Sequence, residues 1–545
     1  MVAIATFLLF AFHITDAWGA HHELWYSITY ATANPDGLFS RTVIGVNGSW
    51  PPPVVEIYAD DTLLIHVHNG LGDTETGVHH HGLFFRNAPW YDGAIGVTQC
   101  PIPVDEIYDY LIDTKTDHIW GSFWYHGHYS GQTVDGLRAP FIIRNYPEVH
   151  RYDDEYVIGL YDWYHESREV LLKEYLSPRN PGGTEPIPNS GVITVAHDGS
   201  YLPGFSENVA IVFKPGKTYR LRIINMSVLA SFSLWLDGHT ISVIEVDGTD
   251  TEPFNVEMAT IAAAQRVSVL VTARNETNMN YLLHAHMDPE MFEEVPKGLN
   301  LNLTSTILYD IDAPLAPPTT VPVYAELPED LIVPIVSQPP LTADTHITVN
   351  ASFALDKEGI NRGFINNVTY TVPKVPTLLT EMMGRNWAWG PAVYGRVNPF
   401  VIKQGHVVEI IINNFDTGAH PFHLHGHRFQ VIAGQSNGSP NETEWTAKSP
   451  LRRDTVTVPA GGSRTIRFKA NNPGAWFFHC HIDWHLFAGL AATFITAPEV
   501  IQNSASSLPK SLIKQCRQLG VPVLGKGVHH RPSDVSPFRW PRFGV

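Results

Sequence analysis

An internal repeat constrains the fold of this chain more than any other feature. The segment "GSFWYHGHYSGQTVDGL" at residues 121–137 aligns without gaps with "GAWFFHCHIDWHLFAGL" at residues 474–490. A second repeated block pairs "TGVHHHGLF" at residues 76–84 with "HPFHLHGHRF" at residues 420–429. Repeated blocks of this kind predict several copies of one structural module.

A third version of the second block, "FSLWLDGHTI", lies at residues 232–241. It keeps Gly238 and His239, which align with Gly426 and His427. Where the other copies carry histidine, this copy carries other residues: Phe232, Trp235 and Asp237. We therefore expect three modules, of which the first and third carry the histidine sets and the middle one does not.

The composition favours β-structure for all three modules. Glycine occurs 42 times and proline 41 times, and short runs rich in Val, Ile and Thr alternate with turn residues. That pattern predicts an all-β chain of sandwiches or Greek-key barrels. Eight prolines in residues 311–340 predict a semi-rigid extended connector. The expected parts are modules at 20–145, 146–312 and 345–500, a linker at 313–344 and a polar tail at 501–545.

The N-terminal residues resemble a secretory signal. One apolar core runs from Ile4 to Phe12, which is too short to cross a bilayer, and small residues follow it. We expect a signal peptide at residues 1–19, no transmembrane segment, and a secreted or cell-wall, N-glycosylated protein. The N-x-S/T sequons that support this expectation are at Asn47, Asn225, Asn275, Asn302, Asn350, Asn367, Asn437 and Asn441.

The net charge narrows the choice of partners. A formal charge of −18 disfavours nucleic acid and anionic membranes, both of which attract basic surfaces. Acidic surfaces are common in secreted proteins, so the charge identifies no partner by itself. We expect a monomer that acts on small molecules.

Four H-x-H pairs dominate the candidate chemistry. Because residues i and i+2 of a strand point to the same face, each pair presents two imidazoles on one side. Imidazole suits copper, zinc, iron and nickel, and eight imidazoles fit a cluster of several ions better than one structural zinc. The pairs are His79/His81, His126/His128, His423/His425 and His479/His481.

The three cysteines predict one disulfide and one free thiol. In an oxidising compartment two of them would pair, and Cys480 is flanked by histidines. We therefore pair Cys100 with Cys516.

If the histidines beside Cys480 face the cluster, the cysteine faces the opposite side of the strand. Its thiolate could bind a separate metal together with His420 and His485. A trigonal His₂Cys site with a weak or absent axial ligand is typical of blue copper. Leu490 is our candidate for the axial position, where it would be a non-ligand. The backbone at Cys480 would then connect an electron-entry copper with the multi-metal cluster.

These motifs resemble a known family. "HHHG", "WYHGH", "HPFHLHGH" and "HCHIDWHLFAGL" are similar to the four copper signatures of the multicopper oxidases, in their laccase and fungal ferroxidase branch. "TQCPI" around Cys100, "DWYH" at 162–165 and "RRDT" at 452–455 extend the resemblance over nearly the whole chain. It implies three consecutive cupredoxin-like domains, four copper ions, and reduction of O₂ to water by four one-electron oxidations of a small substrate.

The resemblance also implies a role for each histidine. The type 1 copper would take His420, Cys480 and His485, and the type 2 copper would take His79 and His423. The type 3 pair would take His81, His126 and His481 on one ion and His128, His425 and His479 on the other.

The resemblance also implies two carboxylates near the cluster, and the sequence differs from the family's pattern at several positions. Asp92 and Asp483 lie where family members keep proton-relay acids.

His80 stands where the family carries an aromatic residue, and we interpret it as a packing residue. His239 and His427 recur in modules with and without ligands, so we expect a structural role for both. Phe487 replaces an acidic or polar residue and could change the rim around the substrate copper.

The reducing substrate is less well determined. The segment "TEPIP" resembles an iron-binding segment of yeast-type ferroxidases at Glu185, and Asp416 precedes His420 as it does there. The third family acid would be Glu293 or Glu294. Glu185 could equally orient a phenol. Our first prediction is a laccase-like oxidase of phenols or aromatic amines; the alternative is an Fe(II) oxidase, and a third hypothesis is a copper or electron-transfer protein without turnover.

Overall fold

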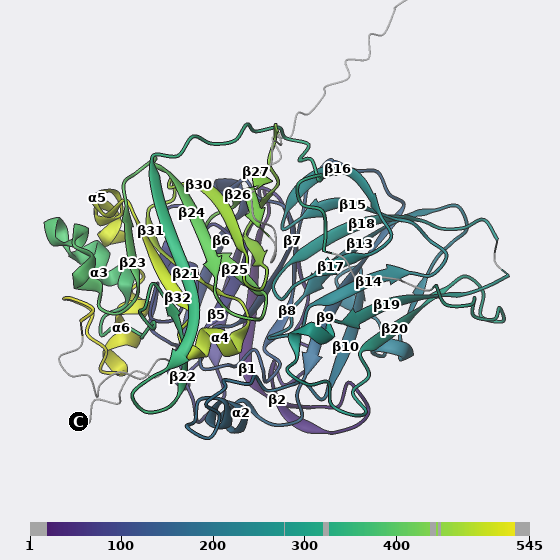
Figure 1. The fold of residues 1–545 in the computed structure, drawn as a ribbon, viewed down its shortest axis with the longest axis horizontal. Coiled ribbons are helices and arrows are strands. Elements are labelled where there is room, and N and C mark those ends of the chain that lie inside the picture. The colour runs from purple at the N-terminus through teal and green to yellow at the C-terminus, as the bar shows by residue number, and fades with distance from the viewer. Residues whose placement is uncertain (1–18, 277, 320–325, 436–442, 445–447, 529–545) are drawn as a thin grey trace, which may run out of the picture.

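A computed structural model describes residues 19–528 except 277, 320–325, 436–442 and 445–447. Strands arranged in six sheets, two to each domain, are the main regular structure of this part, and its helices are few and short (Figure 1). The all-β prediction is therefore confirmed. Within the described residues no helix is long and apolar enough to cross a bilayer. Most of the predicted signal peptide, the end of the tail after residue 528, and the sequons at Asn437 and Asn441 lie outside the described residues.

The first domain consists of two four-stranded sheets. Its elements are β1 (His21–Ala33), β2 (Arg41–Val46), β3 (Val55–Tyr58), β4 (Thr62–Asn69), β5 (Val78–His81), η1 (Pro89–Tyr91), β6 (Ile107–Asp113), α1 (Thr114–Asp117), β7 (Gly121–Gly127) and β8 (Arg138–Arg144). The sheet orders are β2-β1-β4-β6 and β3-β8-β7-β5. In β4, Leu63, Ile65 and Val67 are buried between half-exposed neighbours, which is the alternation of a sandwich strand. In contrast, β5 and β7 are buried along their whole length.

The second domain pairs a seven-stranded with a five-stranded sheet, in the orders β11-β10-β9-β13-β18-β15-β16 and β12-β20-β19-β14-β17. Its elements are β9 (Asp154–Trp163), α2 (Arg168–Tyr175), β10 (Ser190–His197), β11 (Ser200–Tyr201), η2 (Ser206–Asn208), β12 (Ala210–Val212), β13 (Thr218–Asn225), β14 (Phe232–Leu236), β15 (Ile241–Val246), β16 (Thr249–Val256), β17 (Ala259–Ile261), β18 (Arg266–Thr272), β19 (Tyr281–Met287), η3 (Pro289–Met291) and β20 (Asn302–Leu308).

The third domain has a similar two-sheet plan. The orders are β22-β21-β24-β30-β26-β27, with β28 also paired to β26, and β23-β32-β31-β25-β29. The strands are β21 (Thr345–Leu355), β22 (Asn361–Ile365), β23 (Pro399–Ile402), β24 (Val407–Asn414), β25 (His420–Leu424), β26 (Phe429–Gln435), β27 (Thr443–Glu444), β28 (Arg452–Arg453), β29 (Thr455–Val458), β30 (Ser463–Lys469), β31 (Gly474–Cys480) and β32 (Ala491–Thr496). The helices are α3 (Thr377–Met383), η4 (Arg385–Trp389), η5 (Pro391–Tyr394), α4 (Asp483–Ala488), α5 (Pro498–Ile501), η6 (Gln502–Ser507) and α6 (Lys510–Gln518).

The C-terminal segment is fastened to the first domain. Cys516 in α6 and Cys100 form the predicted disulfide, with 5.3 Å between their Cα atoms. The predicted linker contains no strand in its described part and runs along both neighbouring domains. There, Val333 accepts a backbone hydrogen bond from Glu252, and Leu341 donates one to the side chain of Gln430.

The repeat found in the sequence corresponds to one local turn. Gly238 after β14 and Gly426 after β25 have φ angles of 65° and 67°. The following histidines, His239 and His427, place Nδ1 2.7 Å and 3.1 Å from the carbonyl oxygens of Asp237 and His425. A Cβ on Gly426 would lie 2.3 Å from the ring of Trp476, so this turn requires glycine. Both histidines stabilise the turn.

The sequon at Asn225 lies inside the second domain. Asn225 is fully buried at the end of β13, and its side-chain amide donates hydrogen bonds to the carbonyl oxygens of Ala230 and Ile261. A glycan on this amide would require both bonds to break and the strand end to leave the core.

The strand register places the histidine pairs side by side. In the first domain, β5 and β7 are antiparallel and His79 lies opposite His126. In the third domain, β25 and β31 are antiparallel and His423 lies opposite His479. The two H-x-H pairs of each domain therefore occupy adjacent strands.

Candidate metal centre

The four H-x-H pairs converge between the first and third domains. The ring of His79 stacks on that of His425 at 4.0 Å between centroids, and His81 stacks on His423 at 3.8 Å. The other four imidazoles, His126, His128, His479 and His481, complete the same cluster through ring contacts of 5.3 to 5.7 Å. Neither domain contains a complete set, so the cluster exists only when the two domains are packed together.

The chemistry of this cluster fits metal ions. Burial lowers the pKa of seven of the eight imidazoles, and that of His128 falls to about 4, so the rings are neutral at neutral pH. Neutral imidazole is the form that binds metals. Several buried ring nitrogens have no hydrogen-bond partner among the residues that the structure describes, and such burial costs free energy unless a ligand binds these nitrogens. They are His79 Nε2, His81 Nδ1, His126 Nε2, His128 Nε2, His423 Nε2 and both nitrogens of His481.

A separate His₂Cys group lies on the other face of β31. The Sγ atom of Cys480 is 3.5 Å from Nδ1 of His420 and 3.5 Å from Nδ1 of His485, and the two nitrogens are 2.9 Å apart. Burial opposes ionisation of this thiol, but the two imidazoles outweigh it and lower its pKa to about 6. The sulfur is therefore a thiolate at neutral pH, as a copper ligand must be. The site fits one copper ion.

Strand alternation separates the two sites as the sequence predicted. Cys480 points to His420 and His485, whereas the adjacent His479 and His481 belong to the eight-histidine cluster. Leu490 is fully buried, and its backbone carbonyl accepts a hydrogen bond from the Cys480 amide at 3.2 Å. Its axial position remains a prediction.

Asp92 touches the histidine cluster directly. One carboxylate oxygen lies 3.0 Å from Nδ1 of His425, and the backbone carbonyl of Asp92 accepts a hydrogen bond from Nδ1 of His79 at 2.6 Å. Burial raises the pKa of Asp92 well above its ordinary value. The residue is thus a buried carboxyl that can hold a proton beside the cluster.

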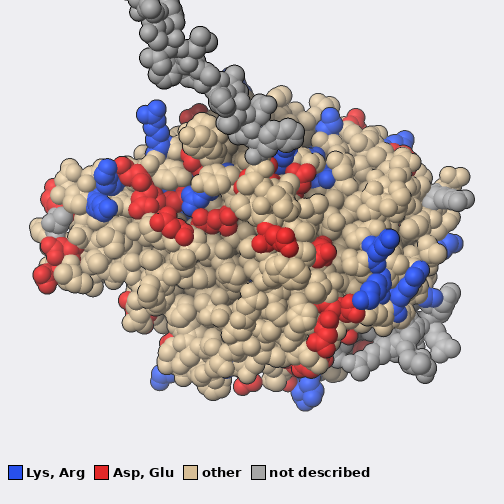
Figure 2. Space-filling view, turned by 180° about the vertical axis from the view of Figure 1, so that it is seen from behind, with Lys and Arg blue, Asp and Glu red and all other residues tan. Residues whose placement is uncertain are grey.

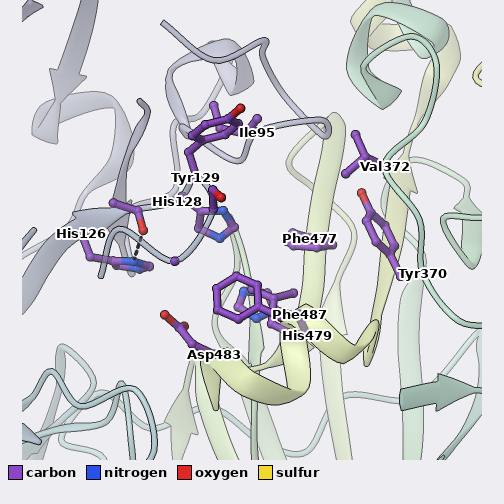
Figure 3. A pocket seen from close by; sticks show the side chains of 14 residues that line it. Ile95, His126, His128, Tyr129, Tyr370, Val372, Phe477, His479, Asp483 and Phe487 are labelled. Carbon is purple, nitrogen blue, oxygen red and sulfur yellow. Dashed lines mark hydrogen bonds between the residues drawn. The ribbon is translucent and has the colours of Figure 1, made fainter. Parts of the chain in front are cut away.

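Asp483 lies at a small cavity that opens onto the cluster (Figure 3). Burial raises the pKa of Asp483 to about 7. The cavity has a volume of about 40 Å³, which is enough for a water-sized molecule. His126, His128 and His479 line it beside Asp483, and much of the remaining wall consists of apolar and aromatic side chains, among them Ile95, Tyr370, Val372, Phe477, Leu486 and Phe487. Phe487 therefore lines the cavity beside the cluster, and it lies in α4, the helix that also carries His485.

The candidate substrate acids gather at the His₂Cys group. Nε2 of His485 lies 2.7 Å from a carboxylate oxygen of Glu185, and Nε2 of His420 lies 3.1 Å from a carboxylate oxygen of Asp416. The third candidate, Glu293, accepts a hydrogen bond from the hydroxyl of Thr184, the residue before Glu185. Hydrogen bonding from His485 and its charge outweigh burial and hold the pKa of Glu185 below its usual value.

Other histidines share the sequence pattern without sharing the site. His80 is buried among Phe85, Tyr110, Tyr125 and Phe141, and burial lowers its pKa to about 3, as befits a packing residue. Two further H-x-H pairs occur in strands that do not reach the cluster. In these pairs His66 bonds to Glu23 and Asp109, His68 to Ser27, and His284 to Asp237.

Asp454 is one residue at the cluster that sequence reasoning missed. One of its carboxylate oxygens lies 3.1 Å from Nε2 of His81, and its backbone carbonyl lies 2.9 Å from Nδ1 of His423. The "RRDT" segment that contains it served only to support the family resemblance. The signal was present, but only the fold shows what the aspartate contacts.

One face of the molecule carries many acidic side chains. On the face shown in Figure 2, acidic side chains gather in a band across the upper part, while Lys and Arg are more scattered. This distribution fits the overall charge of −18. Small cations are the species that such a surface attracts.

Comparison with known proteins decides the family. Three sequence models, each described as multicopper oxidase, match residues 27–148, 154–310 and 367–500. The chain is a multicopper oxidase. Copper binding and the oxidase class follow, and the three matched segments correspond to the three domains of this oxidase.

Relatives with iron in their names are similar over almost the full length of this multicopper oxidase. It is 45% identical to "Iron multicopper oxidase fer1" of Mycosarcoma maydis, over 91% of this chain and 83% of that protein. It is 38% identical to "Iron transport multicopper oxidase fio1" of Schizosaccharomyces pombe, over 92% and 80% of the two chains.

Two solved structures have the same fold. Fet3p, described as a multicopper oxidase that functions in iron import, superposes with a TM-score of 0.86 at 34% identity, covering 93% of this chain and 97% of that one. The laccase from Botrytis aclada gives 0.80 at 28% identity, covering 94% and 95%.

Proposed function

We propose that this multicopper oxidase is a ferroxidase with four copper ions. One copper occupies the His420–Cys480–His485 group and three occupy the eight-histidine cluster. The overall reaction takes four Fe(II), one O₂ and four protons to four Fe(III) and two waters. This proposal replaces phenol oxidation, our first prediction from the sequence, with its alternative.

One observation supports Fe(II) rather than a phenol as the substrate. Both imidazoles of the His₂Cys group turn their outer nitrogens, Nε2, to carboxylates: His485 to Glu185 and His420 to Asp416. The first acid comes from the second domain and the other from the third, so the pair forms only at their junction. Carboxylate oxygens are among the ligands that bind Fe(II) in proteins. Orienting a single phenolic hydroxyl would require only one of them.

The names of similar proteins support the same choice. The relatives that cover most of this chain are called iron or iron transport multicopper oxidases. The structure of Fet3p has a higher TM-score and identity than that of the Botrytis laccase.

The protein's own groups have separable tasks in this scheme. Bound copper supplies the one-electron transfers and the reduction of O₂. Glu185 and Asp416 bind the iron at the outer edge of the two imidazoles and stabilise the additional charge of Fe(III). The Cys480 backbone joins this group covalently to His479 and His481 in the cluster.

Two buried carboxyls are placed to deliver the protons that O₂ reduction consumes. Asp92 contacts His425, and Asp483 lines the cavity beside His126 and His479. Burial raises the pKa of Asp92 well above its ordinary value and that of Asp483 to about 7, so each carboxyl holds a proton more readily than an exposed aspartate. The apolar walls of the cavity keep bulk water from the cluster.

We also propose that the protein is secreted and N-glycosylated. The Cys100–Cys516 disulfide supports an oxidising compartment. Asn47, Asn275 and Asn367 are exposed sequons that could carry glycans. A downward mass shift after enzymatic removal of N-glycans from protein recovered outside the cells tests this point; unglycosylated intracellular protein would contradict it.

The decisive experiment for the ferroxidase proposal compares donors on one preparation. Steady-state kcat/KM would be measured by oxygen consumption with Fe(II) and with a panel of substituted phenols. We expect Fe(II) to give the highest kcat/KM. A phenol that exceeds Fe(II) would restore the laccase prediction, and no oxygen consumption with any donor would favour a protein without turnover.

A further inference from the structure

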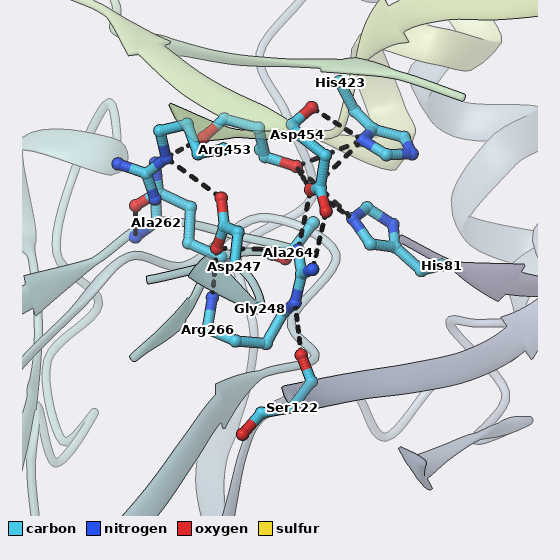
Figure 4. Close-up of polar contacts among 12 residues, drawn as sticks. His81, Ser122, Asp247, Gly248, Ala262, Ala264, Arg266, His423, Arg453 and Asp454 are labelled. Carbon is cyan, nitrogen blue, oxygen red and sulfur yellow. Dashed lines mark hydrogen bonds and ion pairs between the residues drawn. The ribbon is translucent and has the colours of Figure 1, made fainter. Parts of the chain in front are cut away.

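A buried carboxylate connects the middle domain to the histidine cluster (Figure 4). Asp454, between β28 and β29 of the third domain, makes two hydrogen bonds with the guanidinium of Arg266 in β18 of the second domain. The distances are 2.7 Å from Nη1 to Oδ1 and 2.6 Å from Nη2 to Oδ2. Both side chains are fully buried. This two-pronged geometry fixes the carboxylate plane as well as its position.

The same carboxylate orients His81. Its Oδ1 atom lies 3.1 Å from Nε2 of the imidazole. The other ring nitrogen, Nδ1, is buried and has no hydrogen-bond partner in the described part of the chain. A ring with one nitrogen bonded to a carboxylate carries its proton there and presents the other nitrogen as a lone pair. Asp454 thus decides which nitrogen of His81 faces the cluster.

Asp454 also orients His423, but through its backbone carbonyl and through the other ring nitrogen, Nδ1. Its backbone carbonyl accepts a hydrogen bond from Nδ1 of that ring at 2.9 Å, and Nε2 is left buried and unbonded. The two imidazoles stack on each other, one from each histidine-bearing domain. Asp454 therefore contacts one nitrogen on each of two rings that come from different domains, and the Thr455 hydroxyl lies 3.3 Å and 3.2 Å from the same two nitrogens.

Arg266 is itself fixed by all three domains. Its Nε donates to the carbonyl oxygen of Ser122 in β7 at 3.0 Å, and Nη1 donates to that of Ala264 at 3.2 Å. Its backbone amide donates to Asp247 at 2.8 Å. In Figure 4 the guanidinium lies between Ser122 and Asp454. The arginine cannot shift without breaking contacts in the first domain as well as the third.

The glycine after His81 makes this approach possible. Gly82 has a φ of 90°, and a Cβ there would lie 2.7 Å from Nη2 of Arg266 and 3.0 Å from Oδ2 of Asp454. A side chain at position 82 would displace the ion pair from the cluster. The "HHHG" motif thus carries a second requirement besides its histidines.

We infer that Asp454, braced by Arg266, is a positioning residue for the histidine cluster, through which the middle domain contributes to copper binding although it carries no ligand. The aspartate side chain holds His81 and its carbonyl holds His423. Arg266 holds the Asp454 side chain and carbonyl in place relative to the first domain. The inference depends on copper binding in the cluster and not on the identity of the electron donor.

The alternative role is simple attachment of the domains, and the same network contains a control for it. Asp247 accepts hydrogen bonds from the amide of Arg266 and, at 2.9 Å, from the guanidinium of Arg453 in the third domain. It is fully buried, like Asp454, and joins the same two domains, but it has no contact with a cluster imidazole. Replacing either aspartate by asparagine removes the same charge.

The test compares Asp454→Asn with Asp247→Asn in the copper-loaded protein. Copper per chain is measured during competition with a chelator, with the electron paramagnetic resonance of the cluster and the blue absorption of the Cys480 site recorded in parallel. For Asp454→Asn we expect cluster copper to bind about 10–100-fold more weakly, as is usual when a ligand loses its hydrogen-bond partner. The blue absorption should persist. Asp247→Asn should keep its copper and its resonance spectrum.

Three results would overturn the inference. They are unchanged cluster copper in Asp454→Asn, equal copper loss in both variants, and loss of the blue absorption in proportion to cluster copper. Should Asp454→Asn not fold, Arg266→Lys carries the same test, because lysine keeps the charge but cannot make both bonds. We expect a smaller weakening in the same direction, and unchanged cluster copper in this variant would also overturn the inference. A protein that failed as a ferroxidase would still give a clear result, since copper content is read without an iron substrate.

Discussion

Glu185 and His485 share a hydrogen bond of 2.7 Å between Oε1 and Nε2, although they belong to different domains. The same imidazole directs its Nδ1 to Sγ of Cys480 at 3.5 Å. A donor bound at the carboxylate is therefore one aromatic ring away from the thiolate. Burial alone would lower the pKa of His485, but Cys480 and Glu185 outweigh it and raise it to about 10.

Removing this carboxylate should separate the two classes of donor. For Glu185→Ala we expect kcat/KM for Fe(II) to fall about 10–100-fold, because a charge-assisted contact contributes about 1.5–3 kcal/mol. The kcat/KM for a bulky phenol should change by less than about threefold. Parallel stopped-flow and oxygen-electrode measurements on both donors provide the readout.

Asp416→Ala should also lower kcat/KM for Fe(II), because Asp416 makes with His420 the contact that Glu185 makes with His485. Glu174→Ala is the matched control: this glutamate lies in α2, close in sequence to Glu185, and pairs with exposed Arg179. Equal losses for iron and phenol in Glu185→Ala would count against an iron site.

Cys480→Ser should abolish the blue absorption and turnover while the fold remains. The side chain is fully buried between two imidazoles, and a hydroxyl has nearly the same volume as the thiol but is not a thiolate ligand. Circular dichroism should stay unchanged, and about three quarters of the copper should remain if one of four ions is lost. A variant that stayed blue would refute the assignment of this cysteine.

Glu381 should make stability depend on pH. The residue lies in α3, is fully buried, and neither carboxylate oxygen has a hydrogen-bond partner among the described residues. Burial, followed by the charge of Glu499, raises its pKa well above 4.5. The unfolded chain loses this proton near pH 4.5 while the folded chain keeps it. The free energy of unfolding therefore falls as pH rises above 4.5, by about 1.4 kcal/mol for each unit of pKa displacement.

Glu381→Gln removes the ionisation while keeping the shape. We expect its unfolding midpoint to exceed that of the unmodified protein at pH 8 and to approach it near pH 4.5, in denaturant titrations across this range. Glu499→Gln removes only the smaller of the two causes that raise the pKa of Glu381. Its unfolding midpoint at pH 8 should therefore rise less. A pH dependence identical in all three proteins would show that Glu381 is solvated.

The disulfide should hold the C-terminal helix to the first domain. Cys100 and Cys516 are separated by 416 residues, and α6 packs its buried Leu512 and Cys516 inward. A Cys100→Ser, Cys516→Ser double variant should lose about 2–5 kcal/mol of stability and become sensitive to proteolysis near α6. Thermal unfolding and limited proteolysis measure the two effects. Cys480 is buried and free in the structure, so mispairing is not the expected cause.

The ligand types followed from the sequence because they depend on local geometry. The two-residue period of a strand puts His479 and His481 on one face and Cys480 on the other, whatever the surrounding fold. The repeat likewise predicted that the middle domain would keep Gly238 and a structural His239 but no ligand set. The same pattern cannot say which strands meet: His284 and His286 obey it, yet His284 bonds to Asp237 within the middle domain.

Contacts between domains were decided only by the tertiary structure. Glu185 and Asp416 were recognised by resemblance, but their convergence on two imidazoles of one site depends on how the second and third domains pack. Asp454 and Arg266 are 188 residues apart in the chain, and no periodicity links them. By itself the sequence determined which side chains share a face within each strand, because that is fixed by backbone geometry. The domain packing determined which faces meet, because it depends on burial summed over the whole chain.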